Sequence, residues 1–149
     1  MSWLAKLEVD YRVEDHRCVA RHQHEGPLRI LKSLYPEGDS MCHKILVHPP
    51  SGLVGGDELH IRLNLQPQSY ALITTPSATR FYGSNSLTAS QHVHATLADQ
   101  ARLEWLPLEA LAYSACQAHN QVVLKLAPNS QLMAWDITAL GLPHAQPAF

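Results

Sequence analysis

The sequence predicts an all-β fold built from stacked strand–turn–strand units, with a solenoid-like or layered sheet architecture. Three observations predict it. Apolar and polar residues alternate along much of the chain, a strand–turn–strand plan recurs three times, and no stretch carries the sustained apolar stripe of an amphipathic helix. We therefore expect a single β-rich domain over residues 1–149, with more than about 40% strand and less than about 15% helix.

The first expected strand lies near the N-terminus, where apolar residues alternate with charged ones. The apolar positions are Leu7, Val9, Tyr11 and Val13. Period-two alternation places successive side chains on opposite faces, which is typical of a strand with one buried face. A weaker alternation follows at residues 18–21. Residues 43–48 (HKILVH) form a short apolar run that fits a strand more buried than the first.

The remaining strands are expected in three repeated units, at residues 60–75, 92–106 and 121–137. Leu65, Leu97 and Leu126 precede the short polar turn of each unit and lie 32 and then 29 residues apart. The short turns suggest hairpins with one apolar face each. A hairpin alone is marginally stable, so the units should stack or join into a larger sheet system. Two short segments, residues 77–81 and 108–113, are the expected helical turns.

Composition narrows the possible functions. Only 16% of residues are charged, against about 25% in a typical soluble domain, which suggests that partners cover part of the surface. The net charge of −2 and the scattered lysines and arginines give no basic field for nucleic acid. Residues 1–16 contain no unbroken apolar stretch, so we expect neither a signal peptide nor a membrane span. The cysteines lack CxxC spacing and indicate reduced thiols in the cytoplasm.

Five loop strings are far more specific than the composition. They are GPLRILKSLYPEG (26–38), MCHKILVHPPSGLVGGDEL (41–59), TTPSATRFYGS (74–84), LEWLPLEAL (103–111) and LMAWDITALGLP (132–143). In this order they resemble the UreD/UreH family of urease accessory proteins, over nearly the whole chain. Gly83, Leu108 and Leu142 depart from the pattern, since relatives usually have Arg, Gln and Arg there. Any contact that relatives make through those polar groups is therefore in doubt.

The resemblance implies a non-catalytic scaffold that helps assemble the nickel-insertion complex on apo-urease, as part of a metallochaperone system. The implied partners are apo-urease and accessory proteins of the UreF and UreG types. No cofactor would be bound stably, and nickel would pass in transit. Family members are longer than 149 residues, so we expect this chain to be the N-terminal part of such a protein.

By the same resemblance, three carboxylates are candidates to line a nickel route: Asp57, Glu104 and Asp136. Asp57 ends the loop SGLVGGD, which is also explained as a tight turn, because glycines permit close backbone approach and no Walker Lys-Ser/Thr follows. Glu104 and Asp136 each adjoin a tryptophan. Each carboxylate has a structural alternative, namely a hydrogen-bond clamp at the end of a strand.

Histidines are the other candidate metal ligands. His92 and His94 should share one face of a strand, as should His22 and His24 at the same spacing. Without a third ligand nearby in sequence, a solvated polar face is the alternative. Cys42 and His43 are adjacent and should face opposite ways, so Cys42 is expected to be a small buried hydrophobe.

We expect no enzymatic activity, because the sequence contains neither a nucleophile elbow nor a phosphate loop. Two rival functions remain. A hydrolase with an unrecognised site would require a perturbed acid beside a nucleophile. A stand-alone metal-binding module would require three or four ligands at about 2.0–2.2 Å from one ion.

Overall fold

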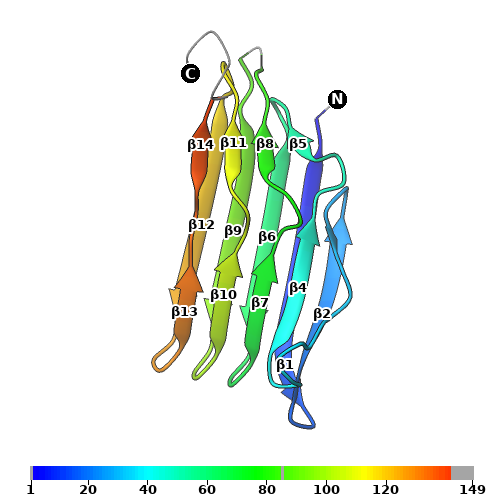
Figure 1. Cartoon of the computed structure of the whole chain (residues 1–149), viewed down its shortest axis with the longest axis vertical. Helices are drawn as coiled ribbons and strands as arrows, with labels where there is room; N and C mark the ends of the chain where they lie inside the picture. The colour runs from blue at the N-terminus through cyan, green and yellow to red at the C-terminus, as the bar shows by residue number, and fades with distance from the viewer. Residues whose placement is uncertain (1, 85, 142–149) are drawn as a thin grey trace.

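A computed structural model describes residues 2–84 and 86–141 (Figure 1). More than half of these residues are in strands, and none is in a helix. The strands are β1 (Leu4–Glu14), β2 (Arg17–Glu25), β3 (Arg29–Ile30), β4 (Cys42–Val47), β5 (Gly52–Leu53), β6 (Glu58–Leu65), β7 (Tyr70–Thr74), β8 (Thr79–Phe81), β9 (Ala89–Leu97), β10 (Arg102–Leu106), β11 (Ala110–Ala112), β12 (Ala118–Leu126), β13 (Gln131–Ala134) and β14 (Thr138–Leu140).

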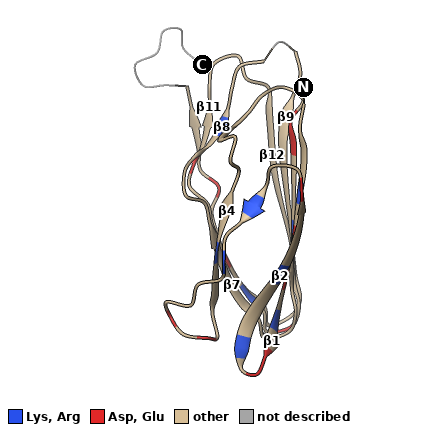
Figure 2. Ribbon diagram, turned by 90° about the vertical axis from the view of Figure 1, so that its right-hand side faces the viewer, with Lys and Arg blue, Asp and Glu red and all other residues tan. Residues whose placement is uncertain are grey.

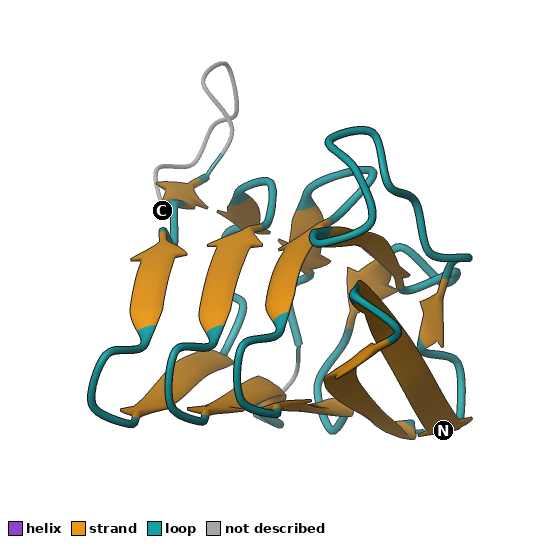
Figure 3. Cartoon of the chain, turned by 90° about the horizontal axis from the view of Figure 1, so that it is seen from below, coloured by secondary structure: helices purple, strands orange, loops and turns teal. Residues whose placement is uncertain are grey.

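The strands form three sheets that together make a solenoid. The long sheet has the order β12-β9-β6-β1-β2, the middle sheet β13-β10-β7-β4-β3, and the short sheet β14-β11-β8-β5. The long sheet is one layer, and the middle and short sheets lie end to end in the facing layer (Figures 1 and 2). Three successive coils (β6–β8, β9–β11 and β12–β14) stack side by side, as Figure 3 shows from below. This confirms the solenoid-like, all-β prediction.

The three repeated units are β-arches, so the prediction that each is a hairpin was wrong. The two strands of a unit, such as β6 and β7, belong to different sheets, and each pairs in parallel with its equivalent in the next coil. The strands of a unit thus face each other across the core. The predicted equivalence of the leucines is confirmed, because Leu65 pairs with Leu97 and Leu97 pairs with Leu126.

The same turn closes each arch. Gln68, Gln100 and Asn129 have positive φ angles of 64°, 56° and 60° at matching places in the three coils. In each turn a backbone N–H reaches back three residues to a carbonyl, at 3.1, 3.1 and 3.2 Å. A repeated local conformation of this kind keeps consecutive coils in register.

The antiparallel strand pairs of the described chain are β1–β2 and β3–β4. The β1–β2 hairpin turns at Asp15 and His16, both of which have positive φ. Of the predicted buried face of β1, Leu7, Val9 and Tyr11 are buried. Val13 is 42% exposed, which corrects that prediction: β1 pairs with β6 only as far as Tyr11, and the hairpin projects beyond it.

Neither expected helical turn is present, which is a second correction. Residues 79–81 form β8 and residues 110–112 form β11, and the two strands pair with each other in parallel. Both segments were judged from local sequence alone, whereas their conformation is set by pairing with the neighbouring coil. Strand β4 has no exposed position, which fits the more buried strand expected there, and Cys42 is fully buried as predicted.

The core fills the space between the two layers. Its largest fully buried side chains come from inward-facing strand positions and one loop residue, Leu28: Tyr11, Leu7, Leu28, Leu53, Leu59, Ile61, Leu63, Leu65, Ile73, Leu97, Leu103 and Val9. In the described chain, the last coil (β12–β14) has a neighbouring coil on one side only. Several of its apolar side chains are therefore exposed: Leu126, Met133, Trp135, Ile137 and Leu140.

Candidate functional site

A cavity of about 50 Å³ lies between the layers, where two of the specific loop strings meet the long sheet. HPPS supplies His48 and Ser51, and TTPSAT supplies residues 75–79. Leu59 and Gln91, on neighbouring strands β6 and β9, line the opposite side. A site of this volume with polar walls has room for ordered water.

His48 is the titratable group on the cavity wall. Its Nε2 atom is buried and has no hydrogen-bond partner among the described residues. Burial lowers the pKa of His48, and the nearby Asp57 carboxylate raises it by a smaller amount. The imidazole is therefore neutral at neutral pH, which leaves a ring nitrogen able to accept a hydrogen bond or bind a cation.

A chain of polar side chains leads from the cavity to the last coil. The Gln91 amide donates to Asn120 Oδ1 at 3.2 Å, and the Asn120 amide donates to Asp136 Oδ2 at 2.9 Å. Gln91 and Asn120 are register partners on β9 and β12 and lie on the core side of the sheet. We call the series from His48 through the cavity, Gln91 and Asn120 to Asp136 the polar track. Its Asp136 end is exposed.

Asp57 lies outside the cavity lining but close enough to His48 to influence its pKa. It is 1% exposed, and its two carboxylate oxygens accept backbone N–H bonds from Trp3 and Val54, each at 2.9 Å. Asp57 therefore joins the N-terminal residues to the glycine loop. This is the geometry of the clamp alternative.

The glycines of SGLVGGD are explained by close packing. A Cβ on Gly52 would lie 2.1 Å from Cε2 of Tyr82, and one on Gly55 would lie 2.6 Å from the Leu87 carbonyl oxygen. Gly56 has a φ of +92°, a conformation that side chains disfavour. The loop is thus a tight turn, as one of the two interpretations expected.

Glu104 lies elsewhere. On β10 it alternates with the buried Leu103 and Trp105, so its side chain is on the outer face of the middle sheet. It accepts a hydrogen bond from the Tyr70 hydroxyl, and this bond is the main reason why the pKa of Tyr70 rises to about 12. The structure therefore places Asp136 at the end of the polar track and Asp57 near His48, and it places Glu104 away from both.

The predicted histidines lie on the outer face of the long sheet. His92 and His94 share the solvent side of β9, as expected, and His60 and His119 join them from β6 and β12. Sequence reasoning missed these two. The signal was available for His60, because it opens its repeat unit as His92 opens the next. No group of three or more His, Cys, Asp or Glu among residues 2–84 and 86–141 is placed to hold one ion.

Two of the positions that depart from the UreD/UreH pattern can be placed. Gly83 has little room for a side chain, since its Cβ would lie 2.9 Å from the Ser114 carbonyl oxygen. Leu108 is 46% exposed. Leu142 lies outside the described residues. Among residues 2–84 and 86–141, no helix has the length and apolarity needed to cross a membrane.

Comparison with known proteins gives a consistent result. A family model described as "UreD urease accessory protein" matches residues 4–149. "Urease accessory protein UreD" of Paracidovorax citrulli is 59% identical over the whole chain, and that of Albidiferax ferrireducens is 59% identical over 97% of it. The Variovorax paradoxus protein of the same name is 56% identical over the whole chain. The chain spans about half the length of these relatives, namely 54%, 52% and 54%.

Proposed function

The chain belongs to the UreD family of urease accessory proteins, and on that premise we propose that it serves as a non-catalytic scaffold in urease maturation. The single observation that carries this proposal is the family match over residues 4–149. In this role the chain would bind apo-urease on one side and accessory proteins of the UreF and UreG types on the other. Its role would be to assemble the complex, and it would catalyse no covalent step itself.

The structure supports a scaffold in two ways. The coils form a stacked frame of paired strands whose outer faces carry exposed side chains. The last coil also presents large exposed apolar side chains, including Met133 and Ile137 at 57% and 54% exposure. Apolar surface of this kind favours protein–protein contact. The three cysteines are free thiols, which fits the proposed cytoplasmic location.

We propose further that nickel, the cargo of maturation, passes through this chain along the polar track. A divalent cation that leaves bulk water needs oxygen or nitrogen groups to replace its hydration shell. The track offers such groups in sequence: the His48 imidazole beside Asp57, then the amides of Gln91 and Asn120, then the Asp136 carboxylate. Glu104 is not on the polar track. It lies on the outer face of β10, where nickel would meet it only on a path over the outside of the stack.

Co-expression tests this proposal. The chain is produced with the urease subunits and the other accessory proteins, and co-purification, nickel per urease and urease activity are measured. Failure to co-purify with any of them would contradict the scaffold role. Asp57→Asn, Glu104→Gln and Asp136→Asn remove each charge while conserving volume.

The three variants distinguish a route from a clamp. Asp136→Asn should lower nickel content and activity while the complex still assembles. Loss of assembly in Asp57→Asn would mark that residue as a clamp, and full activation in all three variants would eliminate the route at these positions. Glu104→Gln tests whether nickel takes the interior path or an outer one. Only an outer path requires the Glu104 carboxylate, so an interior path predicts unchanged nickel content and urease activity in this variant.

A further inference from the structure

Four histidines gather on the outer face of the long sheet: His60, His92, His94 and His119. His60 and His92 are register partners on adjacent parallel strands, and their rings stack with centroids 5.0 Å apart. The His119 ring lies 5.3 Å from that of His92, at a tilt of 43°. His94 follows His92 on the same face of β9. His92 is thus the centre of an imidazole cluster that three strands build.

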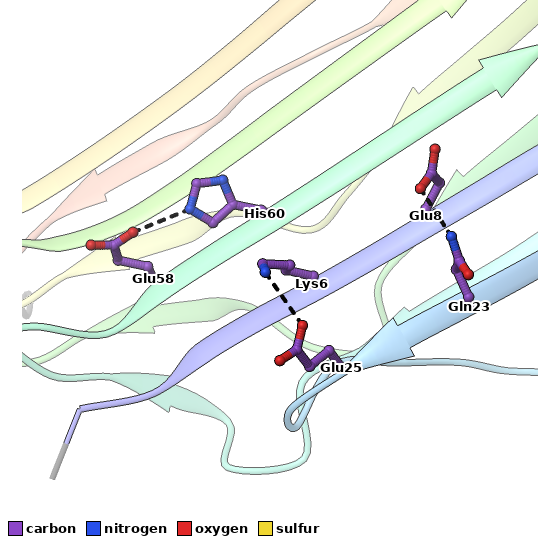
Figure 4. Close-up of polar contacts among 6 residues, drawn as sticks. All are labelled: Lys6, Glu8, Gln23, Glu25, Glu58 and His60. Atoms are coloured by element: carbon purple, nitrogen blue, oxygen red, sulfur yellow. Dashed lines mark hydrogen bonds and ion pairs between the residues drawn. The ribbon is translucent and has the colours of Figure 1, made fainter.

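Two of these rings have the outer hydrogen bonds that ligand histidines usually have. The Glu58 carboxylate lies 3.2 Å from Nε2 of His60, as Figure 4 shows. The amide oxygen of Gln121 lies 3.3 Å from Nδ1 of His92. Both partners are acceptors, so each holds the ring proton on the nitrogen that it contacts. The lone pair is then on Nδ1 of His60 and on Nε2 of His92. In metal sites, carboxylate and carbonyl partners orient ligand imidazoles in the same manner.

We propose that His60 and His92 form a two-histidine surface site for a divalent transition metal ion that prefers imidazole, with water as the remaining ligands. Imidazole nitrogens suit zinc, copper and nickel ions. Two imidazoles that share one ion at about 2.0–2.1 Å have ring centroids on the order of 5 Å apart. The observed spacings match that separation. The rings lie nearly parallel, so binding requires a rotation of the side chains, which their exposure permits.

The surroundings allow an ion at this position. A shallow hollow of about 230 Å³ lies beside His60 and His92, with room for the water ligands that complete the coordination. Lys6 and Arg62 also line it and would repel a cation. Lys6, however, is paired with Glu25 at 3.3 Å, and Glu8 and Glu58 add negative charge (Figure 4).

A second histidine pair provides a matched control. His22 and His24 stack on β2 with centroids 6.4 Å apart, also on this sheet. The Arg29 guanidinium contacts Nδ1 of His24 at 3.1 Å and therefore occupies its lone pair with a cationic donor. This pair should not bind the ion, although its spacing in the sequence is the same as that of His92 and His94.

The experiment is titration of the purified 149-residue chain with Zn²⁺ alone, followed by calorimetry and by NMR of the histidine ring nitrogens. We expect one saturable site. His92→Ala should weaken it at least tenfold, and Glu58→Gln should weaken it about tenfold or more. The double variant His22→Ala/His24→Ala should leave it unchanged. The substituted side chains are at least partly exposed, and circular dichroism verifies that each variant is folded.

Three outcomes would overturn the proposal: no saturable binding below about millimolar Zn²⁺ (an affinity of about −4 kcal/mol), equal binding by His92→Ala and the unaltered chain, or loss in the His22/His24 control. Since the assay contains no urease or accessory protein, its result is independent of the proposed role in maturation.

Discussion

The carboxylate of Asp57 accepts a 2.9 Å hydrogen bond from the backbone N–H of Trp3, 54 positions earlier in the chain. The other oxygen accepts from the N–H of Val54 at the same distance. One buried side chain thus satisfies two backbone donors from separate segments. It fixes the start of β1 against the glycine loop.

Asp57→Asn should lower the free energy of unfolding by about 1–3 kcal/mol, because an amide supplies one acceptor oxygen where two are needed and leaves one partly buried N–H without its acceptor. Urea unfolding measures the change. Asp136→Asn is the control: that carboxylate is exposed and accepts one bond, so its change should be within about 0.5 kcal/mol. Equal effects of the two substitutions would contradict the clamp.

The paired leucines Leu65, Leu97 and Leu126 should contribute very differently to stability in the different coils. Leu97 is 1% exposed between two neighbouring coils, whereas its partner Leu126 is 50% exposed on β12, the edge strand of the long sheet. Leu97→Ala should cost about 2–5 kcal/mol of unfolding free energy, the usual range for a buried leucine. Leu126→Ala should cost well under half as much in the same denaturation assay. If the two costs were similar, the last coil would have to be covered in solution.

Glu104 should control the ionisation of Tyr70. The hydrogen bond to Glu104 raises the pKa of Tyr70 from 10.0 to about 12, with smaller contributions from burial and from the Glu104 charge. Absorbance of the tyrosinate ion, measured against pH, should therefore show late ionisation, and Tyr70→Phe should remove one tyrosine's part of it; burial also raises the pKa of Tyr11, so late ionisation remains in that variant. Glu104→Ala should move the Tyr70 part towards pH 10. An unchanged titration in Glu104→Ala would show that the bond is absent in solution.

The raised pKa of Tyr70 also makes the stability of the fold depend on pH. In the unfolded chain the Tyr70 phenol loses its proton near pH 10, whereas in the folded chain it keeps the proton to about pH 12. The contribution of Tyr70 to stability is therefore present below pH 10 and is lost as pH rises through about 12. Glu104→Ala should flatten the fall in stability over that interval, measured against the unaltered chain.

Gly52 and Tyr82 should behave as a coupled pair. A methyl group on Gly52 would lie 2.1 Å from the Tyr82 ring, so Gly52→Ala must displace the ring from its position against Tyr113, 5.1 Å away. We expect a loss of about 1–3 kcal/mol. In the double variant Gly52→Ala/Tyr82→Ala the two costs should not add, because the clash no longer exists. Additive costs would show that the strain of Gly52→Ala lies in the backbone.

Much of the architecture was predictable, because a repeat of strand–turn–strand units is visible in one sequence. The positions of Leu65, Leu97 and Leu126 gave the register of three coils correctly. The sequence did not show that each unit is an arch. A short polar turn serves both a hairpin and an arch, and only pairing with the neighbouring coils decides between them.

Lys44 shows a second limit of prediction from the sequence. Within HKILVH it has the appearance of an outward position, but it is 3% exposed and its Nζ donates to the Leu31 carbonyl oxygen at 2.9 Å. Burial lowers its pKa. The candidate site had the same difficulty. Asp57 and Asp136 were selected from motif strings, whereas His48, Gln91 and Asn120 are joined to them only by the stacking of coils, which no local pattern records.

The in-register stacking gives the molecule a directional order of unfolding. Each coil contacts only its immediate neighbours, so stability accumulates from coil to coil as in a one-dimensional array. In the described chain, β12 lies at one edge of the long sheet and pairs with β9 alone, whereas β6 pairs with both β1 and β9. Amide hydrogens of β12 should exchange with solvent first, then those of β9 and finally those of β6. Loss of structure would then proceed as fraying from one end of the stack, and anything bound to the β12 edge would protect amides several strands away.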